Sequence, residues 1–242
     1  MNLFSFYIPS RLKVLARWSL VPFYIYRWKR ATRDCERVED LLDVAFNLRC
    51  MALGITPLQI PEEIHQLLKM LAEVDCKRML EIGTAQGGTL YLFSRVVNPD
   101  AVLISVDLPG GAFGGGYPAW KVPFYRSFAS RNQKIHLLRE DSHDSKTLEK
   151  VKGLVDGKPL DFLFIDADHT YEGVKQDFEM YAPLVRPGGI VAFHDIAPHP
   201  ADLQVEVPRF WTEIKSQYRH QEIVKGWDQD GYGIGILRME EK

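Results

Sequence analysis

Cysteine is scarce in this sequence of 242 residues, and no long apolar run is present. The three cysteines, Cys35, Cys50 and Cys76, are odd in number and widely spaced, which argues against a disulfide framework or a CxxC metal site and favours a reducing, cytoplasmic location. The weakly polar run from Trp18 to Tyr26 is far shorter than the ~20 residues of a membrane-spanning helix. No small-residue cleavage site follows it, so a signal peptide is not expected.

Acidic residues are absent from the first 33 positions, although the whole chain is nearly neutral. The net charge of the chain is −2, so no nucleic-acid partner is expected. Residues 1–33 contain no acid, yet they hold seven basic residues and eight aromatic ones. Basic residues mixed with aromatics are typical of segments that lie on an anionic membrane surface. Two interpretations stay open: peripheral attachment at the inner face of a membrane, or a helical extension packed on the domain or on a second subunit of a homo-oligomer.

The rest of the chain alternates between helix-like and strand-like segments. Residues 34–53 carry apolar residues at helical spacing, and Pro61 opens a further helix with acids in its first turn. Continuous apolar segments separated by helices predict a parallel sheet covered on both faces, and the last two segments predict an antiparallel hairpin. The expected strands are RMLEIG (78–83), AVLISVD (101–107), KIHLLRED (134–141), LDFLFID (160–166), GGIVAFHD (188–195), HQEIVKG (220–226) and YGIGILRM (232–239).

The predicted fold is therefore α/β and Rossmann-like: a doubly wound, mostly parallel, seven-stranded sheet with an antiparallel C-terminal hairpin. We expect residues 1–56 to form a basic, aromatic helical extension and residues 57–242 to form the α/β domain. Open α/β sheets bind ligands at the carboxyl ends of their strands. An acid stands at the end of each of the first five expected strands: Glu81, Asp107, Asp141, Asp166 and Asp195.

The turn after the first strand, GTAQGG (83–88), indicates a nucleotide-like ligand. In the dinucleotide fingerprint GxGxxG the middle glycine lies against a pyrophosphate, and Ala85 stands at that position here, which weakens a dinucleotide interpretation. The alternative pattern is an acid, one residue, a glycine, three residues and a glycine, as in Glu81, Gly83 and Gly87. The acid could accept from an ammonium group, directly or through water. A plain strand-turn-helix junction is the structural alternative.

Two further positions support an adenosine ligand. Asp107 lies 24 residues after Gly83, and a carboxylate there can accept both ribose hydroxyls, in dehydrogenases as well as in other nucleoside-binding enzymes. Asp141 and Ser142 follow the third strand and are expected near the adenine. A helix cap with Ser145 nearby explains this second pair equally well.

The stretch from Phe164 to Asp195 is the most specific. Its segments IDADHTYEGV and PGGIVAFHD, with the acid-and-glycine motif at the first turn, resemble class I methyltransferases that use S-adenosylmethionine. The resemblance is to the group related to metal-dependent O-methyltransferases of sugars and macrolides and to cephalosporin-hydroxylase-like proteins, and it covers residues 57–238. It makes residues 57–242 a methyltransferase domain and implies S-adenosylmethionine as the cofactor. The implied cofactor-binding residues are Glu81, Gly83, Thr84, Gly87, Asp107, Asp141 and Ser142.

The same resemblance implies a divalent cation, Mg or Mn, on Asp166, His194 and Asp195. A cation there would lower the pKa of an acceptor hydroxyl. His169 matches the position of the base and, with Asp166, is the implied catalytic pair. The usual pair after the fifth strand has only oxygen ligands, so three alternatives stay open: a different metal, an oxygen shell completed by Asp168 without His194, or no metal. Capping of local helices and loops by these side chains is the structural alternative.

The loop of residues 108–120 has five glycines, and loops of this length are usually functional. We expect a lid over the cofactor and acceptor, with Tyr117 and Trp120 stacking on a sugar ring and Phe113 as a further aromatic. A surface loop without a role is the alternative. Three other aromatics are expected in the core or at an interface: Tyr171, Trp211 and Trp227.

The leading hypothesis from the sequence is an S-adenosylmethionine-dependent O-methyltransferase. Its acceptor would be a small molecule or a glycan. The methylated group would be a hydroxyl of a glycan, a glycolipid or a polyketide sugar. Hydroxylase-like or NAD-dependent redox chemistry on the same fold is one alternative, which Ala85 and the lack of a second redox motif disfavour. A non-catalytic, membrane-associated binding protein is the other, which the acids at all five strand ends disfavour.

Overall fold

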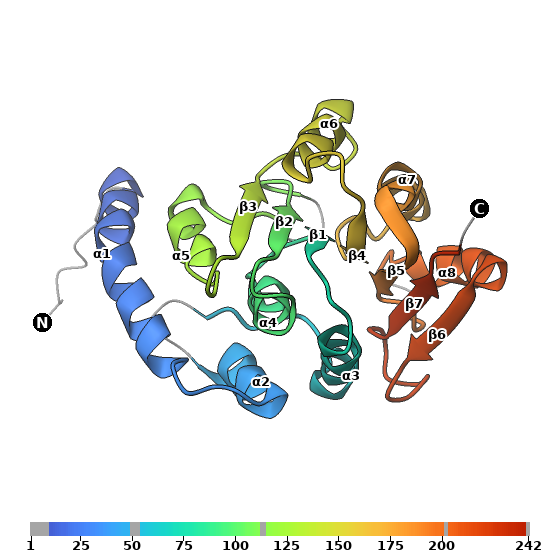
Figure 1. Cartoon of the computed structure of the whole chain (residues 1–242), viewed down its shortest axis with the longest axis horizontal. Coiled ribbons are helices and arrows are strands. Elements are labelled where there is room, and N and C mark those ends of the chain that lie inside the picture. Colours follow the sequence, from blue (N-terminus) through green and yellow to red (C-terminus); the bar gives the residue numbers. More distant parts are fainter. Residues whose placement is uncertain (1–9, 49–53, 112–114, 201–202, 241–242) are drawn as a thin grey trace, which may run out of the picture.

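The computed structural model describes residues 10–48, 54–111, 115–200 and 203–240, as drawn in Figure 1. Cys50, Phe113 and the first nine residues of the basic extension lie outside the described residues. Three single-turn 3-10 helices supplement the α-helices, at Ala119–Lys121, Ala182–Leu184 and Lys215–Gln217. The α-helices are α1 (Ser10–Ala31), α2 (Val38–Asn47), α3 (Pro61–Ala72), α4 (Gly88–Val96), α5 (Val122–Arg126), α6 (Ser145–Leu154), α7 (Tyr171–Tyr181) and α8 (Val207–Ile214).

Seven strands form one sheet in the order β3-β2-β1-β4-β5-β7-β6. The first five strands are parallel, whereas β7 runs antiparallel to β5 and to β6. The predicted mostly parallel seven-stranded sheet with an antiparallel C-terminal hairpin is thus confirmed. The strands are β1 (Arg78–Ile82), β2 (Val102–Val106), β3 (Lys134–Leu138), β4 (Leu160–Ile165), β5 (Val185–His194), β6 (Arg219–Ile223) and β7 (Ile234–Arg238).

Helices cover both faces of the sheet, as Figure 1 shows. Strand β4 illustrates why, because all six of its residues are buried. Phe162 and Phe164 point to the face that α1 to α5 cover, whereas Leu163 and Ile165 point to the face of α6, α7 and α8. Side chains alternate across a strand, so a strand that is apolar at every position needs two covered faces.

Helix α1 packs on the domain through one face. Val21, Tyr24 and Trp28 are buried there, and the Trp28 ring lies 5.1 Å from that of Tyr91 and 5.4 Å from that of Phe124. Packing on the domain was one of the two alternatives for this segment. No helix in the described part of the chain is both long and apolar enough to cross a membrane. The boundary between residues 56 and 57 stays a prediction.

Helix α2 is shorter than the expected helix of residues 34–53. It begins at Val38, where the Asp40 carboxylate accepts from the Arg37 backbone N–H at 3.4 Å and from the Arg37 guanidinium, and it ends at Asn47. Residues 49–53 lie outside the described residues. The Asp40 carboxylate favours this start, because it satisfies a backbone donor that would otherwise lack a partner.

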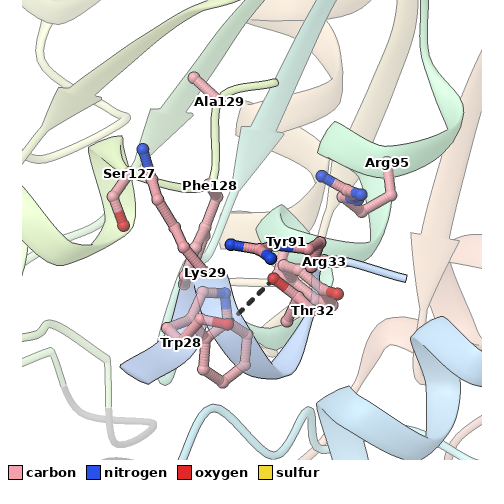
Figure 2. A pocket seen from close by; sticks show the side chains of 9 residues that line it. All are labelled: Trp28, Lys29, Thr32, Arg33, Tyr91, Arg95, Ser127, Phe128 and Ala129. Carbon is pink, nitrogen blue, oxygen red and sulfur yellow. Dashed lines mark hydrogen bonds between the residues drawn. The ribbon is translucent and has the colours of Figure 1, made fainter. Parts of the chain in front are cut away.

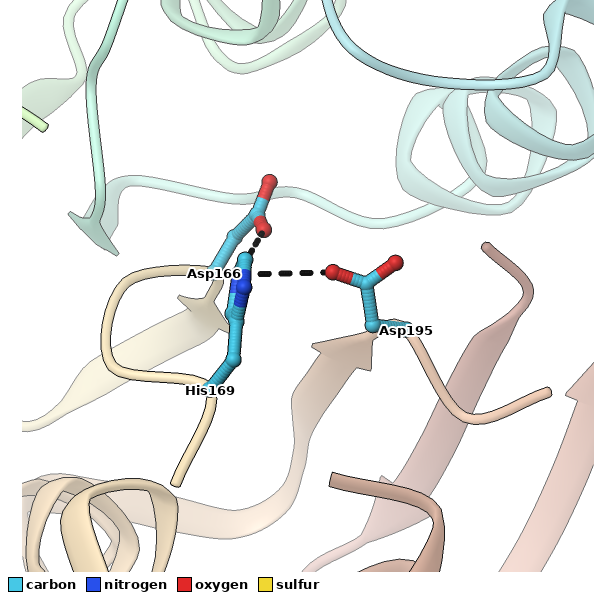
Figure 3. A group of neighbouring side chains, drawn as sticks. All are labelled: Asp166, His169 and Asp195. Atoms are coloured by element: carbon cyan, nitrogen blue, oxygen red, sulfur yellow. Dashed lines mark ion pairs between the residues drawn. The ribbon is translucent and has the colours of Figure 1, made fainter. Parts of the chain in front are cut away.

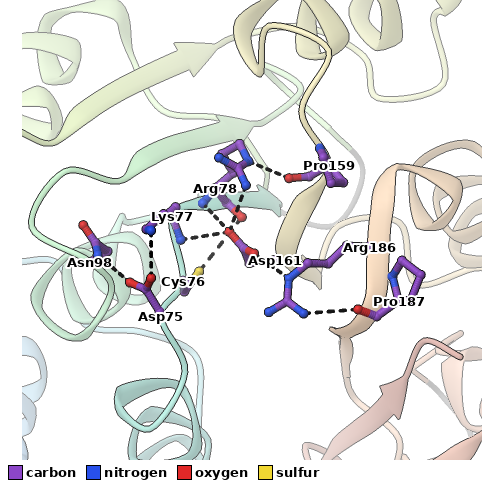
Figure 4. Close-up of polar contacts among 9 residues, drawn as sticks. All are labelled: Asp75, Cys76, Lys77, Arg78, Asn98, Pro159, Asp161, Arg186 and Pro187. Atoms are coloured by element: carbon purple, nitrogen blue, oxygen red, sulfur yellow. Dashed lines mark hydrogen bonds and ion pairs between the residues drawn. The ribbon is translucent and has the colours of Figure 1, made fainter. Parts of the chain in front are cut away.

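One buried carboxylate joins three strands at the end of the sheet where β1 and β4 begin (Figure 4). Asp161 Oδ2 accepts from the backbone N–H groups of Lys77 and Arg78, each at 2.9 Å, and its Oδ1 accepts from Arg186 Nε at 2.7 Å. The side chain is only 5% exposed. These bonds tie the start of β1 and the start of β5 to β4.

A second buried carboxylate fastens the C-terminal hairpin to helix α3. Glu63 Oε1 accepts from Lys225 N–H and from Gln229 Nε2, and its Oε2 accepts from Gly233 N–H. The long connection between β6 and β7 is therefore held by one side chain from a distant helix. It places β7 against β5, the strand that carries part of the site described below.

Replacing Asp161 by alanine should lower the free energy of unfolding by about 3 kcal/mol, because two buried N–H groups and a guanidinium lose their acceptor. Urea unfolding followed by circular dichroism measures this change. Asp75→Ala is the matched control, since Asp75 is an exposed partner of Lys77 in the same region, and its loss should be much smaller. Equal losses in the two variants would contradict a special role for Asp161.

Candidate active site

The carboxyl ends of β4 and β5 bring together four titratable side chains. Asp166 directly follows β4, and His169 follows it in the loop before α7. His194 is the last residue of β5, and Asp195 comes next. Ile165 pairs with Phe193 across the two parallel strands, so the two groups, 28 positions apart in the chain, end side by side. Figure 3 shows three of the four, Asp166, His169 and Asp195, facing one another.

Two carboxylates form the centre of this cluster. His194 Nδ1 lies 3.2 Å from an oxygen of Asp166 and 3.2 Å from an oxygen of Asp195. His169 Nε2 lies 3.3 Å from the same oxygen of Asp195 and 3.7 Å from that of Asp166. The His169 and Asp166 side chains are 21% and 18% exposed, whereas His194 is 3% exposed. His194 thus lies at the buried bottom of the cluster, whereas Asp166 and His169 lie on the side that is open to solvent.

Two members of the cluster were not among the sequence candidates. Gln59 Nε2 donates to Asp166 Oδ2 at 3.0 Å from the segment before α3, and His199 Nε2 lies 3.2 Å from Asp195 Oδ1. The spacing of Asp195 and His199 in HDIAPH was a local signal for the second residue. No local pattern marks Gln59, which is 107 positions from its partner.

Electrostatic coupling sets the charges in the cluster. Burial alone would lower the pKa of His194, but the Asp195 and Asp166 carboxylates outweigh burial and raise that pKa well above its ordinary value. Burial would raise the pKa of both aspartates, but His194 lowers the pKa of Asp166 and, more strongly, that of Asp195. His169 follows the same logic: Asp166 raises its pKa against the effect of burial. The cluster is therefore centred on two ionised carboxylates around the His194 imidazolium.

Backbone strain accompanies this arrangement. Asp195 has φ +63, in the left-handed region that non-glycine residues seldom adopt. Such a conformation costs on the order of 1 kcal/mol or more and persists where the surroundings hold it. Asp195 contacts three histidines, His169, His194 and His199, and these contacts hold it.

The donor set suits a divalent cation. One ligand atom from each of Asp166, His169 and Asp195 lies within 4.8 Å of the other two. Two carboxylate oxygens and one imidazole nitrogen are compatible with Mn, Fe or Zn as well as Mg. This trio contains His169 where the sequence predicted His194, although His194 Nδ1 is equally close to both aspartates. The predicted set of Asp166, His194 and Asp195 stays a prediction.

The glycine turn after β1 lies directly against this cluster. Gly83 has φ +99, and a Cβ there would stand 1.8 Å from the backbone carbonyl oxygen of Asp166. Gly87, the N-cap of α4, has φ +84, and a Cβ there would meet the Tyr125 ring at 2.8 Å. The glycines are therefore required by packing within the protein, and the turn is held next to the end of β4.

The acids at the carboxyl ends of β1 and β2, Glu81 within β1 and Asp107 directly after β2, lie beside the turn. Glu81 is fully buried, and its two oxygens accept from the hydroxyls of Thr89 and Ser105; Ser105 also bonds Thr84. Burial raises the pKa of Glu81 to about 8. No basic side chain in the described part of the chain forms an ion pair with Glu81. A buried carboxylate of this kind fits a cationic ligand group, which would restore its ionised form.

Asp107 is also buried, and each of its carboxylate oxygens already accepts a hydrogen bond from the backbone. Its Oδ2 accepts from Ala85 N–H and its Oδ1 from Gly116 N–H, both at 2.7 Å. Burial raises its pKa. The carboxylate therefore joins the glycine turn to the loop after β2, and binding to ribose hydroxyls would use its remaining lone pairs.

Asp141 and Ser142 lie beyond β3 rather than at its end. Asp141 is exposed and its Oδ1 accepts from His143 N–H at 2.8 Å, which makes a turn before α6. Ser142 is buried, and its carbonyl accepts from the Tyr181 hydroxyl. Asp144 caps α6, as its side chain accepts from Lys146 N–H. A role of the first two residues near adenine stays a prediction.

The expectation for the aromatics of the 108–120 loop is wrong in this structure. Tyr117 and Trp120 are 2% and 8% exposed, so neither offers an open face to a sugar. Tyr117 packs on the Tyr125 ring at 4.9 Å, and the Arg17 guanidinium of α1 lies 5.7 Å from the Trp120 ring. Burial against α5 and α1 is the reason, and neither contact is visible in the local sequence.

The three aromatics expected in the core or at an interface differ in their exposure. Trp211 is 1% exposed and its indole N–H donates to Glu222, which confirms a core position. Trp227 is 53% exposed, so it is not in the core, and the alternative of an interface position stays a prediction. Tyr171 is partly exposed at the start of α7, where it packs beneath the Arg209 guanidinium.

Comparison with known proteins agrees with this geometry. Residues 80–196 match a family model described as a methyltransferase domain. An uncharacterized protein of Sinorhizobium fredii is 28% identical over 49% of this chain and 13% of its own length, and a caffeoyl-CoA O-methyltransferase of Populus kitakamiensis is 24% identical over 78% of this chain and 74% of its own. The chain thus spans only a small part of the first of these relatives.

A solved structure shares the fold. The O-methyltransferase from Bacillus cereus in complex with SAH superposes with a TM-score of 0.54 over 88% of this chain and 99% of that one, at 18% identity. At that identity the likeness shows the fold alone. The arrangement of strands and helices is therefore shared with that O-methyltransferase.

Proposed function

We propose that this chain, which carries a class I methyltransferase domain over residues 80–196, transfers a methyl group from S-adenosylmethionine to a hydroxyl oxygen of an acceptor. The carrying observation is that Gly83, in the glycine turn, lies in contact with Asp166 of the carboxylate cluster. Cofactor and acceptor chemistry would therefore meet at one place, as methyl transfer in line from sulfur to oxygen requires. The redox alternatives lack a comparable observation.

Residues on the β1 and β2 side would hold the cofactor. Glu81 is suited to the ammonium group of the methionine portion, because it is a buried acid without a basic partner among the described residues. Asp107 lies across the turn from it and is suited to the ribose hydroxyls, through lone pairs not used by Ala85 and Gly116. When bound, S-adenosylmethionine supplies the electrophilic methyl group.

Residues on the β4 and β5 side would handle the acceptor proton. His169 lies on the open side of the cluster, where its imidazole can take a proton from a hydroxyl, and Asp166 and Asp195 stabilise the imidazolium that results. His194 keeps the two aspartates in place from below. Asp166, His194 and Asp195 would hold a divalent cation, which would lower the pKa of the acceptor hydroxyl while the His169 nitrogen serves as the base rather than as a ligand.

The proposed acceptor is a hydroxyl on a glycan, glycolipid or polyketide sugar, supported by the resemblance of the DADH and FHD segments. A phenolic hydroxyl is the second candidate, favoured by the likeness to a caffeoyl-CoA O-methyltransferase and to a flavonoid 3',5'-methyltransferase of Vitis vinifera. A phenol has a pKa near 10, far below that of a sugar alcohol, and so needs less activation. Methyl transfer to matched sugar and phenol acceptors distinguishes the two.

The affinity for S-adenosylhomocysteine should increase with pH. Because the pKa of Glu81 is raised to about 8, most Glu81 is protonated near neutral pH, whereas the ligand's ammonium group favours the ionised form. The Kd should fall by about tenfold between about pH 6.5 and pH 8. Glu81→Gln should remove this dependence. Calorimetric titration provides the measurement.

The control ligand is 5′-methylthioadenosine, which shares the adenosine but has no ammonium group. Its affinity should change little over the same range. If both ligands showed the same pH dependence, Glu81 would not be the partner of the ammonium. Titration with NAD runs in parallel, and binding of NAD alone would favour redox chemistry on this fold.

His169→Ala should lower kcat/KM for methyl transfer by a factor of about 100 to 10,000, the usual contribution of a general base. The Kd for S-adenosylhomocysteine should change less than about twofold, since a base contributes to the reaction rather than to cofactor binding. His220→Ala is the control, because His220 is exposed at the far edge of the sheet. Full turnover in the His169 variant would exclude it as the base.

Exhaustive chelation of the protein should abolish methyl transfer, and Mn or Mg should restore it. Asp166→Asn combined with Asp195→Asn should prevent the restoration, because two of the three oxygen and nitrogen donors lose their charge. Calorimetric titration of the chelated protein with Mn reports cation binding separately from activity. Unchanged rates after chelation would leave the reaction to His169 and the aspartates alone.

A further inference from the structure

A pocket of about 240 Å³ lies between helix α1, helix α4 and the segment after α5, as Figure 2 shows. Arg95, one of its lining residues, stands at the C-terminal end of α4, whereas the glycine turn enters α4 at its N-terminal end. The pocket is therefore separate from the candidate active site. We call it the basic pocket; it is lined by Trp28, Lys29, Thr32, Arg33, Tyr91, Arg95, Ser127, Phe128 and Ala129.

Three cationic side chains line the basic pocket: Lys29 from α1, Arg33 from the turn after α1 and Arg95 from α4. Their nitrogen atoms form no ion pair or hydrogen bond with any other residue in the ranges described. The chain does pair an arginine nearby when an acid is at hand, as Arg37 and Asp40 show at 2.8 Å. Three like charges around one small space repel one another, and a bound anion would offset this repulsion.

Tyr91 provides an independent observation. Its side chain is 1% exposed, it lines the basic pocket, and its buried hydroxyl has no hydrogen-bond partner in the part of the chain that the structure describes. Leaving a buried donor unsatisfied costs stability, so most such groups have a partner. Burial raises the pKa of Tyr91, and the hydroxyl therefore keeps its proton and remains a donor.

The other side-chain hydroxyls of the basic pocket already donate hydrogen bonds within the protein. Thr32 Oγ1 donates to the Trp28 carbonyl and Ser127 Oγ donates to the Phe124 carbonyl. The polar side-chain groups of the pocket without a partner among the described residues are thus all donors, on Trp28, Lys29, Arg33, Arg95 and Tyr91, and no carboxylate lines the pocket. Such a set selects an acceptor-only ligand with negative charge.

We propose that the basic pocket binds a phosphomonoester group. A tetrahedral dianion offers enough charge and acceptor oxygens for two guanidiniums, one ammonium and one phenol, whereas a carboxylate offers one charge and two oxygens. The pocket is smaller than the ~300 Å³ at which sites for whole drug-sized ligands begin. It therefore holds the phosphate end of a molecule.

The phosphate could come from a soluble phosphomonoester or from a lipid headgroup. Helix α1 carries exposed aromatics on its outer side, with Trp18 43%, Phe23 44% and Tyr26 61% exposed, next to the basic residues Arg27 and Arg30. Exposed aromatics and basic residues on one helix suit the surface of an anionic membrane. The chemistry recognised in the basic pocket is the same from either source, and the experiment separates them.

The test uses the full-length protein with two probes. Glycerol 3-phosphate is titrated by calorimetry, and phosphatidylcholine vesicles that contain phosphatidic acid are used in sedimentation, with phosphatidylserine vesicles of equal surface charge for comparison. Binding to at least one phosphomonoester probe is expected, and Arg33→Gln combined with Arg95→Gln should weaken it by about tenfold or more. Tyr91→Phe, which removes one hydroxyl, should weaken it several-fold.

The matched control is Arg27→Gln combined with Arg30→Gln, which removes two charges from α1 outside the basic pocket. This control should retain most of the binding. Glycerol 3-phosphate binding that depends on the pocket assigns a soluble source, and binding of phosphatidic acid vesicles alone assigns a lipid headgroup. Equal loss in pocket and control variants, equal binding to phosphatidylserine, or no binding of either probe would overturn the proposal. Thermal melting of Tyr91→Phe shows that the result does not come from unfolding.

Discussion

Two carboxylates within reach of one imidazole nitrogen are the constraint on which the candidate site depends. Asp166 and Asp195 would repel each other at this distance if nothing positive stood between them. His194 Nδ1 lies 3.2 Å from each and supplies that charge. The fold makes the arrangement possible because β4 and β5 are parallel neighbours, so their carboxyl ends open at the same edge. A cation in the same place would satisfy the same electrostatic requirement.

The scaffold holds this edge by bonds made elsewhere. At the other end of the strands Asp161 links β1, β4 and β5, and on the far side Glu63 fastens the hairpin connection whose strand β7 pairs with β5. At the site itself, Gly83 allows the turn after β1 to contact Asp166. The glycine turn and the carboxylate cluster are therefore rigidly related, as the proposed transfer between two bound molecules would need.

Sequence reasoning performed best where one residue type repeats at a regular interval. The strands were predictable because all-apolar runs such as LDFLFI require two covered faces, and the resemblance to class I methyltransferases is confirmed by a match over residues 80–196. It failed for Tyr117 and Trp120, because the local sequence around an aromatic loop residue does not show whether that residue is exposed or buried. It also missed Gln59, whose contact with Asp166 spans 107 positions and leaves no local pattern.

The sequence by itself determined the order of strands and helices and the chemical character of the strand ends, because periodicity and residue type are local properties. It also concentrated positive charge in residues 1–33. Only the tertiary structure decided which imidazole lies beneath the two aspartates and which faces outward, and that Lys29 and Arg33 meet Arg95 of α4 around an unsatisfied Tyr91 hydroxyl. Distances between side chains from separate elements depend on how those elements pack, and packing is a property of the whole chain.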